Sequence, residues 1–275
     1  MKTGYLIDMD GVIYRGGTMI SGATQFINRL IEEMIPFQFV TNNSQRTRRD
    51  ISVKLQRLGV QADENHVYTC ADATAEYLSL QSPNSTAYVI GEGGLLAALH
   101  DKGYAIVEKD PEFVVVGECR TFNAEMIEQA LNHVVNGSKL IATNPDPNCP
   151  TATGTRPGCG AIVSVIEQAS GRKAFSVGKP SPVMMRGARK NIALQASQTI
   201  MIGDTMNTDI LGGVQLGYYT VLVLTGTTQR EDLSNFAYQP ARVVNSVADI
   251  DHDEMVGILQ SRLMEYDFQD SEILV

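Results

Sequence analysis

The sequence has little of what marks several classes of protein. No run of Lys or Arg is longer than a dipeptide, and 31 acidic residues against 22 basic ones give a formal net charge of −9. Proteins that bind nucleic acid usually carry a basic stripe, so we expect no nucleic-acid polymer as a partner. No apolar run is long enough to cross a membrane, and the N-terminus lacks the apolar core of a signal peptide. We therefore expect a cytoplasmic protein without a membrane partner.

Other common site patterns are also missing. The four cysteines form no C-x-x-C pair and the four histidines form no ligand-spaced pair, which weighs against a zinc site and favours reduced thiols. No G-x-x-x-x-G-K-[ST] loop is present. Gly91-Glu92-Gly93-Gly94 lacks the full G-x-G-x-x-G spacing, so a dinucleotide loop there is improbable. An anionic substrate would have to be held by a local site.

What the chain does contain is a regular alternation of two patterns. Its 275 residues, 43% of them hydrophobic, are enough for one large α/β domain or two modest ones. Apolar runs typical of buried parallel strands occur at residues 5–7, 37–40, 87–90, 113–116, 140–142, 199–202 and 219–224. Apolar residues at helical spacing lie between them, for example at residues 27–34, 51–58 and 126–135. This alternation predicts a doubly wound parallel sheet with helices on both faces.

One segment breaks the alternation. Residues 143–160 contain four prolines and three glycines, a density that argues against a regular helix or strand. We expect a long loop there, and long ordered loops in compact domains are often functional.

Carboxylates follow the first predicted strand, as Asp8-Met9-Asp10-Gly11-Val12. Ligands of open α/β sheets bind at the carboxyl ends of the strands, and alternation directs Asp8 and Asp10 to one face there. Two adjacent carboxylates repel each other, and a hard divalent cation such as Mg²⁺ would relieve the repulsion. Taken alone, this motif is more often a simple turn.

Three more polar motifs follow apolar runs. Thr41-Asn42-Asn43-Ser44 follows the second strand, where it could cap a helix or hydrogen-bond a phosphate. Lys179 lies in Gly178-Lys179-Pro180, between an apolar run and a helix start. Asp204 ends another strand, and Asp209 lies one turn into the helix after it. Each motif is ambiguous singly, but all four are predicted at strand ends.

The order of these motifs resembles the signature of the haloacid dehalogenase superfamily. Further segments, among them Val89-Ile90-Gly91-Glu92-Gly93 and Ala142-Thr143-Asn144-Pro145-Asp146, are similar to those of its NagD-type phosphatases, subfamily IIA with a C2-type cap. The resemblance covers roughly residues 4–250. It implies a Rossmann-like α/β core of residues 1–78 and 175–265, an inserted α/β cap of residues 79–174, and a C-terminal tail, residues 266–275.

The resemblance also implies roles for the motif residues. Asp8 would be the nucleophile and Asp10 the acid and base, and Mg²⁺ would be bound by Asp8, the backbone carbonyl of Asp10 and Asp204. Asp209 would orient metal-bound water. The residues expected to face the phosphate or the substrate are Asp10, Thr41, Asn42, Lys179, Thr205, Met206, Asn207 and Thr208. Asn144 and Asp146 would select substrates from the cap loop.

These roles describe a Mg²⁺-dependent phosphomonoesterase. The resemblance suggests nucleoside monophosphates such as UMP or GMP as substrates. Alternatives are sugar phosphates, glycerol phosphate, phosphoglycolate or pyridoxal phosphate. A phosphotransferase is the closer rival and differs only in which acceptor reaches the intermediate, and a regulatory binding protein without turnover is the rival from another class. Assembly into a homo-oligomer is left open.

Overall fold

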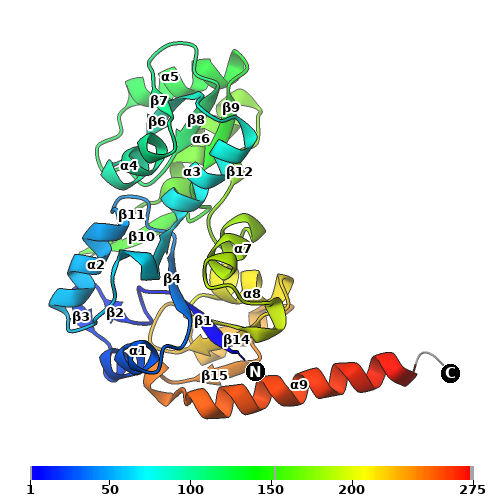
Figure 1. Ribbon diagram of the computed structural model, residues 1–275. Helices are drawn as coiled ribbons and strands as arrows, with labels where there is room; N and C mark the ends of the chain where they lie inside the picture. The colour runs from blue at the N-terminus through cyan, green and yellow to red at the C-terminus, as the bar shows by residue number, and fades with distance from the viewer. Residues whose placement is uncertain (1, 152, 273–275) are drawn as a thin grey trace. The chain divides into compact units, whose positions relative to one another are not determined.

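The chain divides into two compact units, shown with element labels in Figure 1. The computed structural model describes residues 2–151 and 153–272. Unit 1 comprises Met1–Phe39, Leu55–Ala62 and Ala188–Val275, and unit 2 comprises Val40–Lys54 and Asp63–Gly187. The division predicted from the sequence, residues 1–78 with 175–265 against 79–174, has other limits and stays a prediction.

Unit 1 is built on parallel strands in the order β15-β14-β13-β1-β4. Their bounds are β1 Gly4–Ile7, β4 Phe37–Thr41, β13 Thr199–Gly203, β14 Tyr219–Val223 and β15 Arg242–Val244. Every residue of β1, β4, β13 and β14 is buried. Strands covered on both faces read as continuous apolar runs, which is why the sequence predicts these four correctly.

The helices of unit 1 include α1 Ala23–Glu32, α8 Leu211–Gln215 and α9 His252–Glu272. The face of α1 that packs inward carries Ala23, Phe26, Ile27 and Leu30, at the helical spacing that the sequence predicts. The predicted tail, residues 266–275, continues α9 as far as Glu272, and residues 273–275 lie outside the described residues. No helix of the described residues is long and apolar enough to cross a membrane.

Unit 2 has its own parallel sheet, in the order β12-β9-β8-β6-β7. The strands are β6 Thr86–Ile90, β7 Ala105–Ile106, β8 Phe113–Val116, β9 Lys139–Ala142 and β12 Phe175–Ser176. Alternate residues of β6, β8 and β9 pack against α5 Ala124–Val135 and α6 Cys159–Ser170 in one buried cluster. The predicted second α/β core between residues 79 and 174 is therefore present as a packed sheet and helices.

β5 Val67–Thr69 follows β4 in the order of the six-stranded sheet. The other elements of the described residues are β2 Tyr14–Arg15, β3 Thr18–Met19, α2 Arg48–Arg57, α3 Cys70–Gln81, α4 Gly93–Asp101, α7 Pro182–Asn191 and five short helical turns. One of those turns, the π-helical Met206–Ile210, directly follows β13 and leads into α8. Strand–helix alternation with parallel pairing confirms the predicted α/β fold class.

The prediction of an irregular loop at residues 143–160 is wrong in its middle part. β10 Asn148–Thr151 and β11 Gly154–Pro157 form an antiparallel hairpin, in which Cys149 pairs with Arg156 and Pro150 with Thr155. Each strand of a two-stranded ribbon has one side without a partner. A proline whose nitrogen faces that side removes no ladder hydrogen bond, so proline content did not exclude strands here.

Candidate active site

Three carboxylates meet at the carboxyl ends of two neighbouring strands of unit 1. Ile7 of β1 pairs with Ile202 of β13, and the chain leaves these strands into Asp8 and Asp204. Asp8, Asp204 and Asp209 each offer a carboxylate oxygen, and these oxygens all lie within 4.8 Å of one another. The sequence predicted all three residues for the site, and the structure brings them together.

Asp209 reaches this group because the chain turns back immediately after β13. The π-helical turn at Met206–Ile210 places the fully buried Asp209 against Gly203. A Cβ atom at Gly203 would collide with the Asp209 side chain, so only glycine allows this close approach. The backbone N–H of Thr205 donates to Asp209 Oδ2 at 3.2 Å. Asp209 is thus fixed by the same turn that carries Asp204.

Asp204 is held by its neighbours on both sides of the turn. Its Oδ2 accepts a hydrogen bond from the backbone N–H of Thr227 at 2.5 Å, and its Oδ1 accepts one from the Thr205 hydroxyl at 3.0 Å. A Cβ atom at Gly226 or at Gly11 would collide with the Asp204 carboxylate. The side chain is only 3% exposed. Its orientation is therefore set before any ligand binds.

This donor set suits a hard divalent cation. All three groups offer carboxylate oxygens, the ligands that Mg²⁺ and Ca²⁺ prefer. Asp204 and Asp209 are buried, so the repulsion among the charges is weakly screened by solvent. The group of Asp8, Asp204 and Asp209 could therefore hold a metal ion. Within residues 2–151 and 153–272, no other group of three or more His, Cys, Asp or Glu side chains is placed to do so.

Asp10 lies outside the three-carboxylate group. It is exposed, and its backbone forms an isolated bridge with Tyr14, the first residue of β2. Tyr14 is buried, and the pKa of its phenol is raised by that burial and further by the charges of Asp10 and Asp8. The phenol therefore stays protonated in the physiological range. Exposure of Asp10 suits a side chain that exchanges protons with a bound molecule.

The segment from residue 205 to residue 208 is only partly open. Met206 is 1% exposed and packs with Ile210 and Leu222 in a small cluster. Its N–H donates to the Thr228 hydroxyl at 3.2 Å, and its carbonyl accepts from the Tyr238 hydroxyl at 3.0 Å. Asn207 is exposed, and Thr205 and Thr208 are half-buried. The predicted substrate contact of Met206 is untested, and its side chain belongs to the core.

A second polar cluster lies in unit 2, around Asn42. The Lys179 N–H donates to Asn42 Oδ1 at 2.8 Å, and Asn42 Nδ2 donates to the Lys179 carbonyl at 3.1 Å. Lys179 is 2% exposed, which is rare for a lysine in a globular protein. Thr41 is buried, and its hydroxyl accepts from the Asn43 N–H at 3.2 Å. The structure thus brings Asn42 and Lys179, predicted as phosphate contacts, into one cluster.

The two predicted specificity residues join this same cluster. Asn42 Nδ2 donates to Asp146 Oδ2 at 3.0 Å, and Asn144 Nδ2 donates to the Asn42 carbonyl at 2.8 Å. Asn144 is fully buried, so its amide supports Asn42. Burial raises the pKa of the Asp146 carboxyl, while the Asn42 hydrogen bond and the Lys179 charge act against that rise. The specificity roles of Asn144 and Asp146 remain predictions.

Comparison with known proteins agrees with this arrangement. A family model described as haloacid dehalogenase-like hydrolase matches residues 5–105, and one described as HAD-hydrolase-like matches residues 176–250. A dihydroxyacetone phosphatase of Corynebacterium glutamicum is 41% identical over 246 residues, 90% of each chain. Ribonucleotide monophosphatase NagD of Escherichia coli is 38% identical over 246 residues, 90% of this chain and 97% of that one. The chain belongs to the haloacid dehalogenase family.

Solved structures place it within that family. The solved structure of NagD from the E. coli K-12 strain matches with a TM-score of 0.86 and 37% identity, over 90% of this chain and 98% of that one. A p-nitrophenyl phosphatase from Archaeoglobus fulgidus matches with a TM-score of 0.85 and 37% identity, over 90% and 97%. The protein is a NagD-type phosphatase with the family's Rossmann-like core and an inserted cap, as its sequence predicted.

Sequence reasoning missed several residues that shape this phosphatase's site. Thr225, Gly226 and Thr227 follow β14. Thr225 donates to the Gly11 carbonyl, and Gly226 and Thr227 contact Asp204. The usable signal was a run of small polar residues directly after a predicted strand, the same signal that singled out Thr41. In unit 2, Glu118 and Arg156 form an ion pair at 2.9 Å that joins β11 to the loop after β8. No local sequence pattern predicts this pair.

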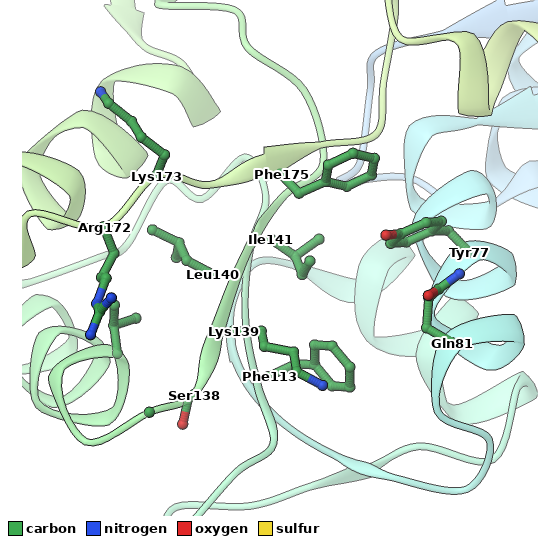
Figure 2. A pocket seen from close by; sticks show the side chains of 12 residues that line it. Tyr77, Gln81, Phe113, Ser138, Lys139, Leu140, Ile141, Arg172, Lys173 and Phe175 are labelled. Carbon is green, nitrogen blue, oxygen red and sulfur yellow. The ribbon is translucent and has the colours of Figure 1, made fainter.

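The cap-like sheet of unit 2 also carries a groove unrelated to the predicted residues. It measures about 610 Å³ and lies beside β9 and β12. Figure 2 shows Tyr77 and Phe175 facing each other there, with ring centroids 4.8 Å apart and planes 23° apart. Lys139 Nζ lies 5.0 Å from the centroid of the Phe113 ring. None of the predicted site residues lines this groove.

Proposed function

We propose that this phosphatase hydrolyses small phosphate monoesters through an aspartyl-phosphate formed on Asp8, with Mg²⁺ as cofactor. The observation that carries the proposal is the convergence of Asp8, Asp204 and Asp209 within 4.8 Å at the carboxyl ends of β1 and β13. A divalent cation would relieve the repulsion among these carboxylates, of which Asp204 and Asp209 are buried and Asp8 is half-exposed and accessible to a substrate.

In the first step a carboxylate oxygen of Asp8 attacks phosphorus, and the bond from phosphorus to the leaving oxygen breaks. Asp10, in its protonated form, gives its proton to that oxygen, so the product leaves as a neutral alcohol. The exposed position of Asp10, two residues after the nucleophile, supports this role.

In the second step water attacks the phosphorus of the aspartyl-phosphate. Asp10, now a carboxylate, takes a proton from that water, and inorganic phosphate leaves as the Asp8 carboxylate is restored. One residue thus serves as acid and then as base, and the enzyme returns to its starting protonation state.

The phosphoryl oxygens require positive charge and hydrogen-bond donors. We assign these contacts to Lys179 and Thr41, with Asn42 as a further contact. Lys179 is almost fully buried, and a buried ammonium is stabilised when it faces an anion. The reciprocal hydrogen bonds with Asn42 fix the Lys179 backbone, which supports a defined direction for its side chain.

The carboxylates of Asp8 and Asp204 and the backbone carbonyl of Asp10 would hold Mg²⁺. Asp209 would accept hydrogen bonds from the waters that complete its coordination. When bound, the cation would neutralise charge on the phosphoryl group and on Asp8. The chemistry of the donor set fits, since all these atoms are hard oxygen donors.

The substrate class proposed from the sequence is nucleoside monophosphates. NagD of E. coli, a ribonucleotide monophosphatase by name, supports it at 38% identity. The dihydroxyacetone phosphatase at 41% identity and an acid sugar phosphatase of Staphylococcus epidermidis at 40% support triose and sugar phosphates instead. All are small phosphate monoesters, so the reaction proposed is the same for each.

The test is a phosphate-release assay with the purified chain over UMP, GMP, dihydroxyacetone phosphate, sugar phosphates, glycerol phosphate, phosphoglycolate, pyridoxal phosphate and p-nitrophenyl phosphate, each with Mg²⁺ and with chelator. We expect Mg²⁺-dependent release, with kcat/KM highest for a nucleoside monophosphate. Acid quenching during turnover should trap phosphate on the wild-type chain and none on Asp8→Asn. A higher kcat/KM for the triose or sugar phosphates overturns the nucleotide assignment, and release without trapped phosphate overturns the mechanism.

A further inference from the structure

Thr225 contacts both ends of the loop that follows the nucleophile strand. Its hydroxyl donates to the Gly11 carbonyl at 2.6 Å. Its own backbone carbonyl accepts a hydrogen bond from the Arg15 guanidinium. Thr225 lies two residues beyond the end of β14 and 214 residues from Gly11 in the sequence. One residue therefore joins the start and the end of the loop from residue 11 to residue 15.

The rest of that loop is closed by local hydrogen bonds. The Met9 carbonyl accepts from the N–H groups of Val12, Ile13 and Tyr14, and the Gly11 N–H donates to the Tyr14 carbonyl at 2.8 Å. These bonds fix the loop's internal shape. The Thr225 contacts instead fix where the loop sits against the sheet of unit 1.

The Gly11 carbonyl belongs to the Gly11–Val12 peptide, one peptide beyond the bond that joins Asp10 to Gly11. Gly11 has φ of 84°, a conformation that favours glycine, and a Cβ there would collide with Asp204 and lie 3.0 Å from the Gly226 Cα. The loop thus packs directly on the segment of Thr225 and Gly226. Asp10 itself is exposed, directly before this glycine. A rotation of the peptide between residues 10 and 11 would redirect the Asp10 carboxyl.

We propose that Thr225 is a positioning residue, whose hydroxyl bond to Gly11 and carbonyl bond from Arg15 hold the Asp10 carboxyl in line for proton transfer to the leaving oxygen. The inference rests on the proposed acid role of Asp10. Thr225 makes none of the hydrogen bonds given above for Asp204 and Asp209, which come from Thr205 and Thr227.

The experiment compares two substrates in the full-length chain. p-Nitrophenolate is a good leaving group and needs little protonation, whereas an alkoxide leaves only with a proton. We therefore measure kcat/KM, which covers steps through departure of the leaving group, for p-nitrophenyl phosphate and for an alkyl phosphate such as glycerol phosphate. Thr225→Val keeps the shape of the side chain and removes the donor. Thr225→Ser keeps the donor.

We expect Thr225→Val to lower kcat/KM for the alkyl phosphate by roughly three- to tenfold, the worth of one hydrogen bond. The loss for p-nitrophenyl phosphate should stay below about twofold, and Thr225→Ser should restore most of the alkyl phosphate activity. Arg15→Met removes the hydrogen bond to the Thr225 carbonyl and should lower the same kcat/KM value. It serves as the second variant if Thr225→Val does not fold. Thr18→Val, the same change at an exposed position of the β2–β3 hairpin, should leave both values unchanged.

Asp10→Asn separates failure of this inference from failure of the proposed function. If Asp10→Asn lowers kcat/KM by the same factor for both substrates, Asp10 is not the acid and the proposed mechanism is wrong. If Asp10→Asn is selective while Thr225→Val and Arg15→Met are not, the positioning inference is overturned and the mechanism stands. Equal losses in Thr225→Val for both substrates, accompanied by a lower melting temperature, assign Thr225 a structural role only and likewise overturn it.

Discussion

Asn42 and Lys179 hold each other through two reciprocal hydrogen bonds, one in each direction, at 2.8 and 3.1 Å. The neighbouring Gly178 makes this possible, because a Cβ there would lie 2.6 Å from Asn42 Oδ1. A single amide side chain therefore fixes the backbone of the lysine assigned to the phosphoryl group and also donates to Asp146. Asn42 thus holds Lys179 and Asp146 in place, in addition to its proposed contact with the phosphoryl group.

Replacing Asn42 by alanine should therefore affect binding and stability together. The substitution removes the hydrogen bonds that the Lys179 N–H and carbonyl make with the Asn42 amide. This loss should lower the free energy of unfolding by about 1–3 kcal/mol. Displacement of Lys179 should raise KM by a larger factor than it lowers kcat. Steady-state kinetics and chemical denaturation check both effects. Asn132→Ala, at an exposed position of α5, is the control; equal behaviour of the two variants would contradict the role of Asn42.

Because burial raises the pKa of Asp146, we expect Asp146→Asn to increase the stability of the protein by an amount that depends on pH. Burial makes the folded-state pKa higher than the unfolded one, so ionised Asp146 costs stability. This cost is fully present above the folded pKa and disappears as pH falls below the ordinary value. Relative to wild type, Asp146→Asn should be more stable near about pH 7 than near about pH 3.5. Parallel denaturation curves at both pH values measure this, and a pH-independent difference would refute it.

Asp8→Asn should abolish turnover while leaving the fold intact. The amide attacks phosphorus poorly and carries no charge for a metal, so activity should fall by several orders of magnitude. Removing one of three mutually repelling carboxylates should keep or raise the melting temperature in chelator. Asp101→Asn, exposed at the end of α4, should match wild type in both respects. Activity above a few per cent in a non-deamidated preparation rules out Asp8 as nucleophile.

Metal removal should act on activity and on stability. Chelator should stop phosphate release and Mg²⁺ should restore it, with Ca²⁺ much less effective because it takes more and longer oxygen bonds. Since a ligand of the folded state stabilises it by mass action, Mg²⁺ should raise the melting temperature of wild type. The rise should shrink in Asp204→Asn. Undiminished turnover in chelator would contradict the metal assignment.

The sequence predicts the strands and their end residues well for a physical reason. β1, β4, β13 and β14 are buried on both faces, so each reads as a short apolar run. Parallel strands bring their carboxyl ends to one edge, which makes Asp8 and Asp204 candidates on the strength of their sequence positions alone. Local pattern and architecture are enough for these residues.

The misses involve contacts that no local pattern encodes. Thr225 meets Gly11 across 214 residues, and Asn144 meets Asn42 across 102. No local pattern indicated that the Met206 side chain packs in a core cluster with Ile210 and Leu222, while its predicted substrate contact stays a prediction. At β10 and β11, proline and glycine content suggested irregular structure where a two-stranded ribbon forms. Only the tertiary arrangement decides such cases.

The β10–β11 hairpin is held to the rest of unit 2 by a largely buried ion pair. Arg156 of β11 donates to Glu118 at 2.9 Å and to Gln45 at 3.2 Å, and the Cys149 thiol opposite Arg156 donates to Glu118 at 3.1 Å. The Glu118 and Arg156 side chains are 8% and 20% exposed. Burial, followed by the Glu118 charge, raises the pKa of Cys149 to about 12, so the thiol remains a donor. Arg156 thus compensates the charge of Glu118, and the neutral Cys149 thiol adds a hydrogen bond to it.

Arg156→Met should consequently leave a buried carboxylate without its cation and destabilise the protein by about 3–5 kcal/mol. The double variant Glu118→Gln with Arg156→Met should recover much of the lost stability, because it no longer has an unpaired carboxylate at residue 118. Lys173→Met breaks the Lys173–Glu167 pair, whose lysine is 79% exposed, and should cost less than about 1 kcal/mol. Denaturant midpoints for the three variants measure these differences. A loss in Arg156→Met no larger than that in Lys173→Met would show that the hairpin does not depend on the Glu118 pair.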